Sequence, residues 1–504
     1  MIVPHFNDLL QLSDKFNVIP MYKMIHADDE TPISIYQKIR NNHSFLLESV
    51  EGGERWARYS IIGVKPFLRL TGKGYDLQIY NDKDEVTIET GNPVQYLKEL
   101  LSTMKSPVFS ELPPFFGGAV GYFGYDTITY VEKIPKIEHD PLELPDISFL
   151  FCDELIVYDH LKQRIFLICH LHVEPNDTEK QLKTKYQHTM GRISKLQDKI
   201  SKGKSKGYLS MTGMDEINSL HAFKSNMTKN EFEEMVEKAK EYIKSGDIFQ
   251  VVLSQRFHRK TQVDPFMVYR MLRTINPSPY MYYLQFEKEV LVGTSPEMLI
   301  RVENGKVETK PIAGTRPRGK SKEEDNRLKM DLLQDEKEAA EHHMLVDLGR
   351  NDVGRISSYG TVTVNQFKEV EYYSHVMHLV SHVTGELRPD ITAYDALMSA
   401  FPAGTVSGAP KIRAMEIIAE LEKEARGPYA GAIGYFGFNG NMDTCITIRT
   451  ILFVNDQAYV QAGAGIVADS IPEKEYEETC NKAMALIKAI VTAEQCSYSD
   501  QEVI

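Results

Sequence analysis

Apolar and polar residues alternate along much of the first half of the chain, as they do in half-buried β-strands. Residues 74–89 predict a hairpin with its turn at residues 81–84, and residues 154–172 predict another with its turn at residues 160–163. Residues 175–204 are polar, rich in Lys and Gln, and have helical spacing. The pattern therefore predicts a β-rich first half that is followed by a helix.

A second periodic region starts near residue 225. Thr228 and Glu231 form a capping box, and apolar residues line one face of the predicted helix until Gly246 ends it. Residues 430–465 predict one antiparallel meander with turns at residues 439–440 and 455–456.

The pattern also suggests how the chain is divided. Residues 205–225 include a Gly- and Ser-containing break and predict a linker between an N-terminal region, 1–204, and a second region, 226–490. Residues 491–504 are expected to be a tail. AGAIGYFGFN, from residue 430, repeats GGAVGYFGYD, from residue 117, and this likeness suggests two similar strands in paired sheets, unless it is a chance similarity of two β-rich segments.

Composition narrows the function classes. At 504 residues with 42% hydrophobic residues, the chain can bury a large core. Its formal charge of −13 disfavours nucleic acid and anionic membranes as partners. Its five scattered cysteines argue against a disulfide framework or a zinc site, and no signal peptide or membrane span is evident. We therefore expect a cytoplasmic protein.

A Gly/Thr/Ser turn precedes a predicted helix at residues 401–420. Glycines allow close backbone approach, and the first N–H groups of a helix attract anions, so Gly404, Thr405, Ser407 and Gly408 predict a site for a carboxylate or phosphate. The alternative is that Ser407 only caps the helix.

Two pairs of carboxylates have helical i, i+3 spacing. Glu475 and Glu478 share a helix face with Lys482, and Glu338 and Glu341 repeat the spacing upstream. Facing each other, such helices would offer oxygen ligands that suit Mg²⁺, whereas the alternative is two solvated acidic faces.

Arg449 is predicted to lie within a strand, residues 444–450, on the face that also carries Cys445 and Thr447. Its guanidinium could hold a carboxylate in two bonds, and Tyr429 could add a phenol donor. The alternative for both residues is surface exposure.

Two glycine motifs need separate interpretation. Residues 314–321 fit the phosphate-loop pattern, but the preceding segment is too polar for a buried parallel strand, and Pro317 removes one N–H donor. Residues 463–468 fit part of a dinucleotide motif, but they follow an antiparallel strand. We therefore favour neither nucleotide site, and expect the backbone N–H groups near Gly463 to bind a carboxylate.

Several segments together resemble the chorismate-utilising enzymes, most closely the large subunit, component I, of anthranilate synthase. They are PIAGTRPRG from residue 311, HHMLVDLGRND from 342, the segment 401–420 and QAGAGIVADSIPEKEYEETCNKA from 461. LLES at 46–49, RYS at 58–60 and GGAVGYFGYD at 117–126 extend the likeness. The resemblance implies an α+β fold, in which two antiparallel β-sheets pack face to face with helices outside and the N-terminal region is partly interleaved with the catalytic body.

The resemblance also implies an activity. It predicts a magnesium-dependent carbon–oxygen lyase that converts chorismate and ammonia to anthranilate and pyruvate, the first step of tryptophan biosynthesis. Gln250 and Ala313 stand where related enzymes carry a water-activating or a nucleophilic Lys, so ammonia itself is the expected nucleophile. No Cys–His glutaminase is evident, so ammonia would come from solution or from a glutamine amidotransferase subunit, component II.

Individual roles follow from the same resemblance. Glu297 is the expected general acid, His378 is expected at the pyruvate elimination, and Thr405 at the substrate ring, with Gln250 completing the catalytic set. Glu341 and Glu478 are the expected metal ligands, with Glu338 and Glu475 as outer or alternative ligands. The expected substrate-binding residues are Gly314, Thr315, Tyr429, Arg449, Gly463, Ala464, Gly465 and Lys482.

A second site is implied for feedback inhibition by L-tryptophan. Its expected residues are Glu48, Ser49, Pro279, Tyr280 and Met281, with carboxylate and hydroxyl addressing an amino group. Three alternatives stay open: the large subunit of aminodeoxychorismate synthase, a phosphate-loop nucleotide hydrolase, and an inert tryptophan-binding regulator.

Overall fold

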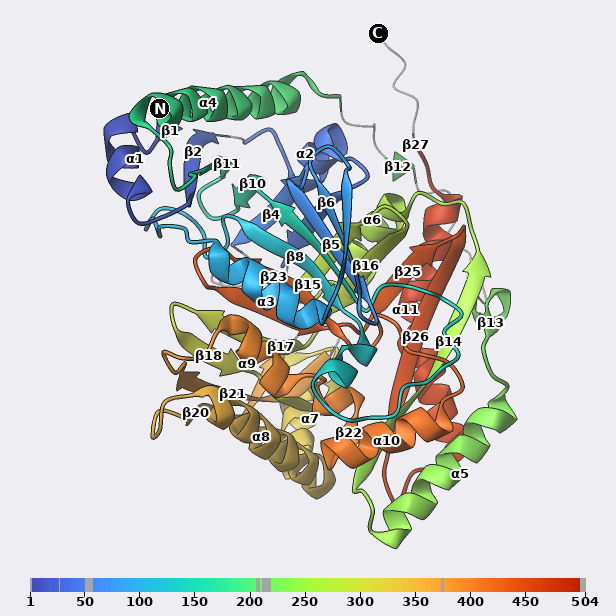
Figure 1. Cartoon of the computed structure of the whole chain (residues 1–504). Coiled ribbons are helices and arrows are strands. Elements are labelled where there is room, and N and C mark those ends of the chain that lie inside the picture. The colour runs from blue at the N-terminus through green and yellow to red at the C-terminus, as the bar shows by residue number, and fades with distance from the viewer. Residues whose placement is uncertain are drawn as a thin grey trace.

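Two large β-sheets packed face to face, with helices on their outer sides, make up the molecule (Figure 1). The computed structural model describes residues 2–26, 28–49, 58–204, 209–210, 219–372 and 376–498. Tyr122 of one sheet and Phe166 of the other belong to one buried apolar cluster between the sheets. The strand pairings of both sheets are antiparallel, and the expected α+β fold class is confirmed.

The first sheet has 13 strands. β22 (Gly408–Ala409) pairs with β14 beside the main path. In spatial order the others are β1 (Ile2–Val3), β2 (Val18–His26), β11 (Arg164–His172), β10 (Glu154–Asp159), β4 (Tyr59–Val64), β3 (Ser44–Glu48), β15 (Tyr280–Gln285), β16 (Glu289–Ser295), β25 (Thr450–Val454), β26 (Gln457–Ile466), β14 (Gln250–Lys260) and β13 (Lys224–Ser225).

The second sheet has 12 strands. β20 (Thr363–Tyr372) pairs with β21 beside its main path, and β12 (Leu209–Ser210) pairs with β27 (Ser497–Tyr498) apart from both sheets. In spatial order the others are β19 (Ile312–Pro317), β21 (Val376–Glu386), β18 (Lys306–Thr309), β17 (Met298–Glu303), β24 (Met442–Ile446), β23 (Ala432–Gly437), β8 (Gly118–Phe123), β9 (Ile147–Cys152), β5 (Leu68–Lys73), β6 (Asp76–Asn81) and β7 (Val86–Thr90).

Helices cover the outer faces of both sheets. α6 and α11 pack on the first sheet, and α8 and α9 pack on the second. The α-helices are α1 (Phe6–Ser13), α2 (Pro32–Ile39), α3 (Pro93–Thr103), α4 (Glu179–Lys202), α5 (Lys229–Ser245), α6 (Pro265–Ile275), α7 (Lys322–Gln334), α8 (Glu336–Ile356), α9 (Ala393–Ala400), α10 (Lys411–Leu421) and α11 (Pro472–Gln495), and the short 3-10 helices are η1 (Tyr125–Tyr130), η2 (Ser219–Ala222) and η3 (Gly404–Val406).

Predictions that rest on local signals are confirmed. The two N-terminal hairpins are β6–β7 and β10–β11, and the polar helix is α4. Helix α5 begins after Thr228, whose side chain accepts a hydrogen bond from the N–H of Glu231, and it ends at Gly246 with φ of 85°. No helix among the described residues is both long and apolar enough to cross a bilayer.

The predicted meander of residues 430–465 is wrong as a single sheet. It is two hairpins, β23–β24 in the second sheet and β25–β26 in the first. Arg449 therefore does not lie within a strand: it lies in the crossing between β24 and β25, where its φ is 51°. The periodicity of the segment did not reveal the crossing because both hairpins alternate in the same way.

A second crossing runs beside the first. The chain passes from β16 in the first sheet to β17 in the second through Glu297, and the two crossings are hydrogen-bonded to each other. The N–H of Ile446 donates to the carbonyl of Glu297 at 3.1 Å, and the N–H of Thr294 donates to the carbonyl of Arg449 at 3.1 Å. Glu297 and Arg449 are thus placed at one seam between the sheets.

Strands from the two halves of the chain alternate within the sheets. β3 lies beside β15, and β8 lies beside β23. The division into regions 1–204, 205–225, 226–490 and 491–504 stays a prediction. Within it, residues 205–208, 211–218 and 499–504 lie outside the described residues.

The repeated glycine-rich segments form neighbouring strands of one sheet, β8 and β23, with Gly121 opposite Gly434. A Cβ on Gly121 would lie 2.0 Å from the carbonyl oxygen of Ser148, so a side chain has no room there. A Cβ on Gly434 would likewise lie 2.1 Å from the carbonyl oxygen of Asp443, so the two strands share a steric requirement. The expectation that they lie in paired sheets is wrong, because they are neighbours in one sheet.

We expect Gly121→Ala to lower the stability by about 1–3 kcal/mol, because backbone atoms must move to admit the methyl group. The measurement is the melting temperature, compared with that of Gly191→Ala. Gly191 lies in α4, and a Cβ added there would meet no atom within 4 Å, so alanine should leave stability unchanged or raise it. Equal melting temperatures for both variants would contradict the steric argument.

Candidate active site

A cavity of about 650 Å³ lies where β14 and β26 of the first sheet, β19 and β21 of the second, and helices α8 and α11 meet. Its lining unites residues that are more than 200 positions apart in the sequence. The expected site residues that line it are Gln250, Glu297, Gly314, Thr315, Glu338, Glu341, His378, Thr405, Tyr429, Arg449, Gly463, Gly465, Glu475, Glu478 and Lys482.

Ala464 is the one expected substrate-binding residue that does not line this cavity. Side chains alternate along β26, so Gly463 and Gly465 face the cavity while Ala464 packs, fully buried, in the apolar core. The side chain of Ala464 therefore has no contact with the cavity, and the expected binding of substrate by its backbone stays a prediction.

Glu297 carries the properties of a general acid. The Thr405 hydroxyl donates to its Oε1 atom at 2.9 Å. Burial raises the pKa of Glu297 to about 7, against the lowering effects of the Thr405 hydrogen bond and the charge of Lys482. A carboxyl group with this pKa is protonated in a large fraction of molecules near neutral pH and can donate a proton.

The turn that carries Thr405 differs from the expected anion site. Ser407 is buried and donates to the carbonyl of Ala403 at 2.8 Å, and β22 separates the turn from α10, which begins at Lys411. Only Thr405 and Val406 of this segment line the cavity, so the expected joint use of the turn and the helix N-terminus is wrong. Ser407 does not cap α10 either.

His378 is held against β19. Its Nδ1 atom lies 3.0 Å from the carbonyl oxygen of Gly314 and 3.0 Å from the hydroxyl of Thr315. Since a carbonyl oxygen only accepts, Nδ1 carries the proton in this arrangement. Gly314 has φ of 65°, which favours glycine, and a Cβ there would lie 3.2 Å from the carboxylate of Glu338.

Two cations and a phenol form one wall of the cavity. Arg449 donates to the carbonyl of Lys482 at 2.9 Å, and Lys482 donates to the carbonyl of Gly463 at 2.9 Å. Burial lowers the pKa of Arg449, while Tyr429 and Glu478 act in the opposite direction. Burial raises the pKa of Tyr429 to about 12, so its hydroxyl stays a hydrogen-bond donor.

Carboxylates of α8 and α11 also line the cavity, and Glu478 pairs with Lys482 at 2.7 Å on α11. The pKa of Glu341 is raised by burial first and then by the charge of Glu338, and that of Glu475 is raised by burial and by Glu478. These groups repel one another, so a cation between them would be stabilised. The predicted convergence of the two helices on one cavity is thus observed.

This donor set fits Mg²⁺. Among the described residues, no three His, Cys, Asp or Glu side chains enclose a metal site by themselves. Mg²⁺ commonly keeps several waters and takes one or two carboxylates, with substrate oxygens completing the shell. Glu341 and Glu478, one from each helix, could hold the ion in this way.

The sequence interpretation missed Lys337 and Gln461, which also line the cavity. Lys337 lowers the pKa of both Glu341 and Glu475 through its charge. Projection of α8 as a helix could have found Lys337, four residues before Glu341, and strand alternation could have found Gln461, two residues before Gly463.

The segment that fits the phosphate-loop pattern has a different structure. β19 pairs antiparallel with β21, and the two arginines of the segment pair with carboxylates of α7 and of its junction with α8. Arg316 contacts Asp331 at 2.6 Å and Asp335 at 2.7 Å, and Arg318 contacts Asp325 at 2.7 Å. The segment is therefore not a nucleotide-binding loop.

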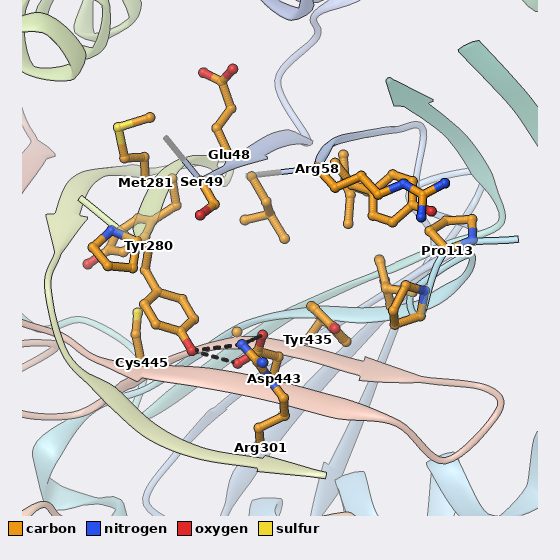
Figure 2. A pocket seen from close by; sticks show the side chains of 18 of the residues that line it. Glu48, Ser49, Arg58, Pro113, Tyr280, Met281, Arg301, Tyr435, Asp443 and Cys445 are labelled. Atoms are coloured by element: carbon orange, nitrogen blue, oxygen red, sulfur yellow. Dashed lines mark hydrogen bonds and ion pairs between the residues drawn. The ribbon is translucent and has the colours of Figure 1, made fainter. Parts of the chain in front are cut away.

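A second cavity, of about 500 Å³, is lined by all five residues expected to bind tryptophan (Figure 2). Ser49 points into it, and its hydroxyl is buried without a hydrogen-bond partner among the described residues. At its floor, Tyr280 donates to Asp443 at 2.9 Å, and Arg301 pairs with Asp443 at 2.7 Å.

Glu48 lines this cavity, but its carboxylate is bound by side chains of α6. Its carboxylate points away from the centre of this cavity (Figure 2) and accepts from the Tyr269 hydroxyl at 2.7 Å and from Arg273 at 3.0 Å. In this structure α6 holds the carboxylate, so its expected contact with a ligand amino group stays a prediction. No signal in the sequence linked Glu48 to α6, which supplies both partners.

Comparison with known proteins places the chain in a family. Residues 44–488 match the family described as chorismate binding enzyme. The chain is 52% identical to anthranilate synthase component 1 of Acetivibrio thermocellus, over 98% of this chain and 99% of that protein. It is 47% identical to the component 1 of Aquifex aeolicus, over 97% and 98%.

Solved structures agree. The crystal structure of anthranilate synthase component I from Streptococcus pneumoniae superposes with a TM-score of 0.73 at 42% identity, over 92% of this chain and 99% of that one. The isochorismate synthase MenF of Escherichia coli, at 18% identity and a TM-score of 0.67 over 96% and 98%, shares the fold. The chain belongs to the chorismate binding enzymes. Its full-length relatives there are named anthranilate synthase component 1, and the resemblance inferred from the sequence is confirmed.

Proposed function

We propose that this chain converts chorismate and ammonia to anthranilate and pyruvate. The observation that carries the proposal is the presence, in one cavity, of a half-buried acid with a pKa of about 7 and of cations suited to carboxylates. The names of the full-length relatives support it independently. Chorismate carries two carboxylates, and the cavity offers Arg449 and Lys482 for them.

The two carboxylates of the substrate bind to different residues of the cationic wall. The enolpyruvyl carboxylate is bound by Arg449, Tyr429 and the backbone at Gly463 and Gly465. Lys482 binds near the ring carboxylate. The guanidinium and phenol can donate together to one carboxylate. A side chain at Gly463 would obstruct this arrangement, since its Cβ would lie 2.6 Å from the Tyr429 oxygen.

Proton transfer falls to Glu297 and His378. Glu297 protonates the ring hydroxyl so that it leaves as water while ammonia forms a bond to ring carbon 2, and Thr405 orients the carboxyl group. His378 serves the later step, in which pyruvate leaves and the ring becomes aromatic. Glu341 and Glu478 would hold Mg²⁺, which would supply positive charge at the ring carboxylate.

Ammonia is the nucleophile, and an amidotransferase subunit supplies it. Gln250 lines the cavity and hydrogen-bonds Glu341, and Ala313 lines it without any nucleophilic atom. A relative named component 1 implies a second component, which would release ammonia from glutamine. Aminodeoxychorismate synthase remains the nearest alternative.

Product analysis tests this proposal. Purified protein with chorismate, Mg²⁺ and ammonium should release equal amounts of anthranilate and pyruvate, measured by fluorescence and mass. An aminated product that retains its enolpyruvyl group would indicate aminodeoxychorismate synthase instead. No turnover together with tryptophan binding would indicate a regulator.

The pKa of Glu297 predicts a pH dependence. A general acid acts in its protonated form, so kcat should fall as pH rises through about 7, the pKa raised by burial. In Thr405→Val the hydrogen bond that lowers this pKa is lost, so the alkaline limb of the kcat profile should move to higher pH. An unchanged limb would argue against Glu297 as the acid.

Repulsion among the carboxylates predicts metal-dependent stability. Mg²⁺ should raise the melting temperature of the wild type because it binds the folded state, and Glu341→Gln or Glu478→Gln should reduce that rise. Glu473→Gln is the matched control. Glu473 lies on α11, as Glu478 does, but it pairs with Lys229 and does not line the cavity. The same rise in all variants would rule out this metal site.

The second cavity is proposed to bind L-tryptophan as a feedback inhibitor. Its Pro, Tyr and Met side chains can surround an indole, and the Ser49 hydroxyl lacks a partner among the described residues. The two cavities share no described lining residue, so inhibition would act through a change in conformation, and each ligand would weaken binding of the other.

We expect Ser49→Ala to weaken tryptophan binding by about 0.5–2 kcal/mol, with uninhibited turnover nearly unchanged. Tryptophan titration of activity and of calorimetric heat measures this effect. Ser194→Ala, on the exposed face of α4, is the control. Parallel loss of activity and sensitivity in Ser49→Ala would contradict a separate inhibitor site.

A further inference from the structure

A buried ion pair lies behind the chorismate cavity, just after α10. Side-chain exposure is 0% for Arg426 and 3% for Glu422. The guanidinium bonds the carboxylate at both oxygens, from Nη2 to Oε1 at 2.6 Å and from Nε to Oε2 at 2.8 Å. Neither residue lines the cavity, and the proposed chemistry does not use them.

The remaining donors of Arg426 reach the backbone of two cavity walls. Nη1 donates to the carbonyl of Val406 at 2.8 Å, and Nη2 donates to the carbonyl of Val252 at 2.7 Å. Val406 follows Thr405 directly, and Val252 lies in β14. One guanidinium thus joins η3 to the first sheet.

The Glu422 carboxylate reaches a third wall. Its Oε1 atom accepts from the N–H of Ser254 at 2.8 Å and from its hydroxyl at 2.9 Å. The same hydroxyl accepts from the amide of Gln461, a cavity residue of β26, at 2.9 Å. The carboxylate therefore fixes the spacing of neighbouring strands at the cavity.

Two aromatic rings lie close to the guanidinium of Arg426. Its carbon lies 4.6 Å from the ring centre of Tyr125 and 5.7 Å from that of Tyr429, the phenol proposed to bind substrate. Burial of an ion pair is costly and contributes little net stability compared with apolar residues of equal volume. Stability alone therefore does not account for a charge pair in this place.

We propose that the Arg426–Glu422 pair is a positioning element of the active site, which sets the place of Thr405, and through it the Glu297 carboxyl, relative to the substrate-binding wall. The proposal rests on the proposed function. The guanidinium holds Val406, so the adjacent Thr405 is held at hydrogen-bond distance from Glu297. The groups that act on the Glu297 carboxyl are the Thr405 hydroxyl and the charge of Lys482.

Glu422→Gln is the principal test, because it keeps the volume and removes the charge that orients the guanidinium. Displacement of catalytic groups by a fraction of an ångström to 1 Å should lower kcat/KM on the order of tenfold to a hundredfold. The alkaline limb of the kcat profile should also move to higher pH, since Glu297 loses the Thr405 hydrogen bond. A merely structural role would reduce the amount of active protein and leave the limb in place.

Glu424→Gln is the matched control. Glu424 pairs with Arg256 in the same region, but that pair contacts no carbonyl of a cavity residue among the described residues. Its kcat/KM and pH profile should equal those of the wild type. The wild-type protein is assayed for anthranilate at the same time. If it makes none, the proposed function is overturned rather than the positioning role.

Ser254→Ala gives a second readout that does not disturb the charges. It breaks the link from Gln461 to Glu422, so KM for chorismate should rise several-fold with kcat nearly unchanged. This variant decides the question if Glu422→Gln does not fold. The proposal is overturned if the wild type is active while folded Glu422→Gln keeps its pH profile and kcat/KM, or if Ser254→Ala keeps the wild-type KM.

Discussion

The active site depends on two hydrogen-bonded crossings between the sheets. One carries Glu297 and the other Arg449, and each crossing fixes the other through backbone bonds of 3.1 Å. Arg449 adopts φ of 51°, a conformation that costs a residue with a side chain about 1–3 kcal/mol and persists only when neighbours enforce it. The acid and the guanidinium thus gain a fixed separation from the architecture itself, rather than from contacts between their side chains.

In this acidic protein, positive side chains are placed at the candidate active site. The whole chain carries −13, yet Arg449 and Lys482 are held to backbone carbonyls at the cavity, where an anion can reach them. Lys482 also pairs with Glu478 at 2.7 Å, and the carboxylates of α8 and α11 repel one another. Under the proposed function, a dianionic substrate and a divalent cation would each reduce the electrostatic cost of binding the other.

Sequence predicted what local signals encode. The capping box at Thr228, the i, i+3 carboxylates and the hairpin turns need only a few neighbouring residues, and all formed as predicted. The meander failed because membership of one sheet or the other is decided by pairing with distant strands. The roles of the Glu48 carboxylate and of the Arg426–Glu422 pair were likewise invisible, since their partners come from other elements.

The alternation of strands from both halves has a consequence for synthesis. β3, which ends at Glu48, lies between β4 and β15, and β15 ends at Gln285. On the ribosome the N-terminal half emerges first, so β3 leaves one edge exposed until more than half of the chain has been translated. The second cavity is therefore assembled late, and a nascent chain that stalls before β15 presents an open strand edge to its surroundings.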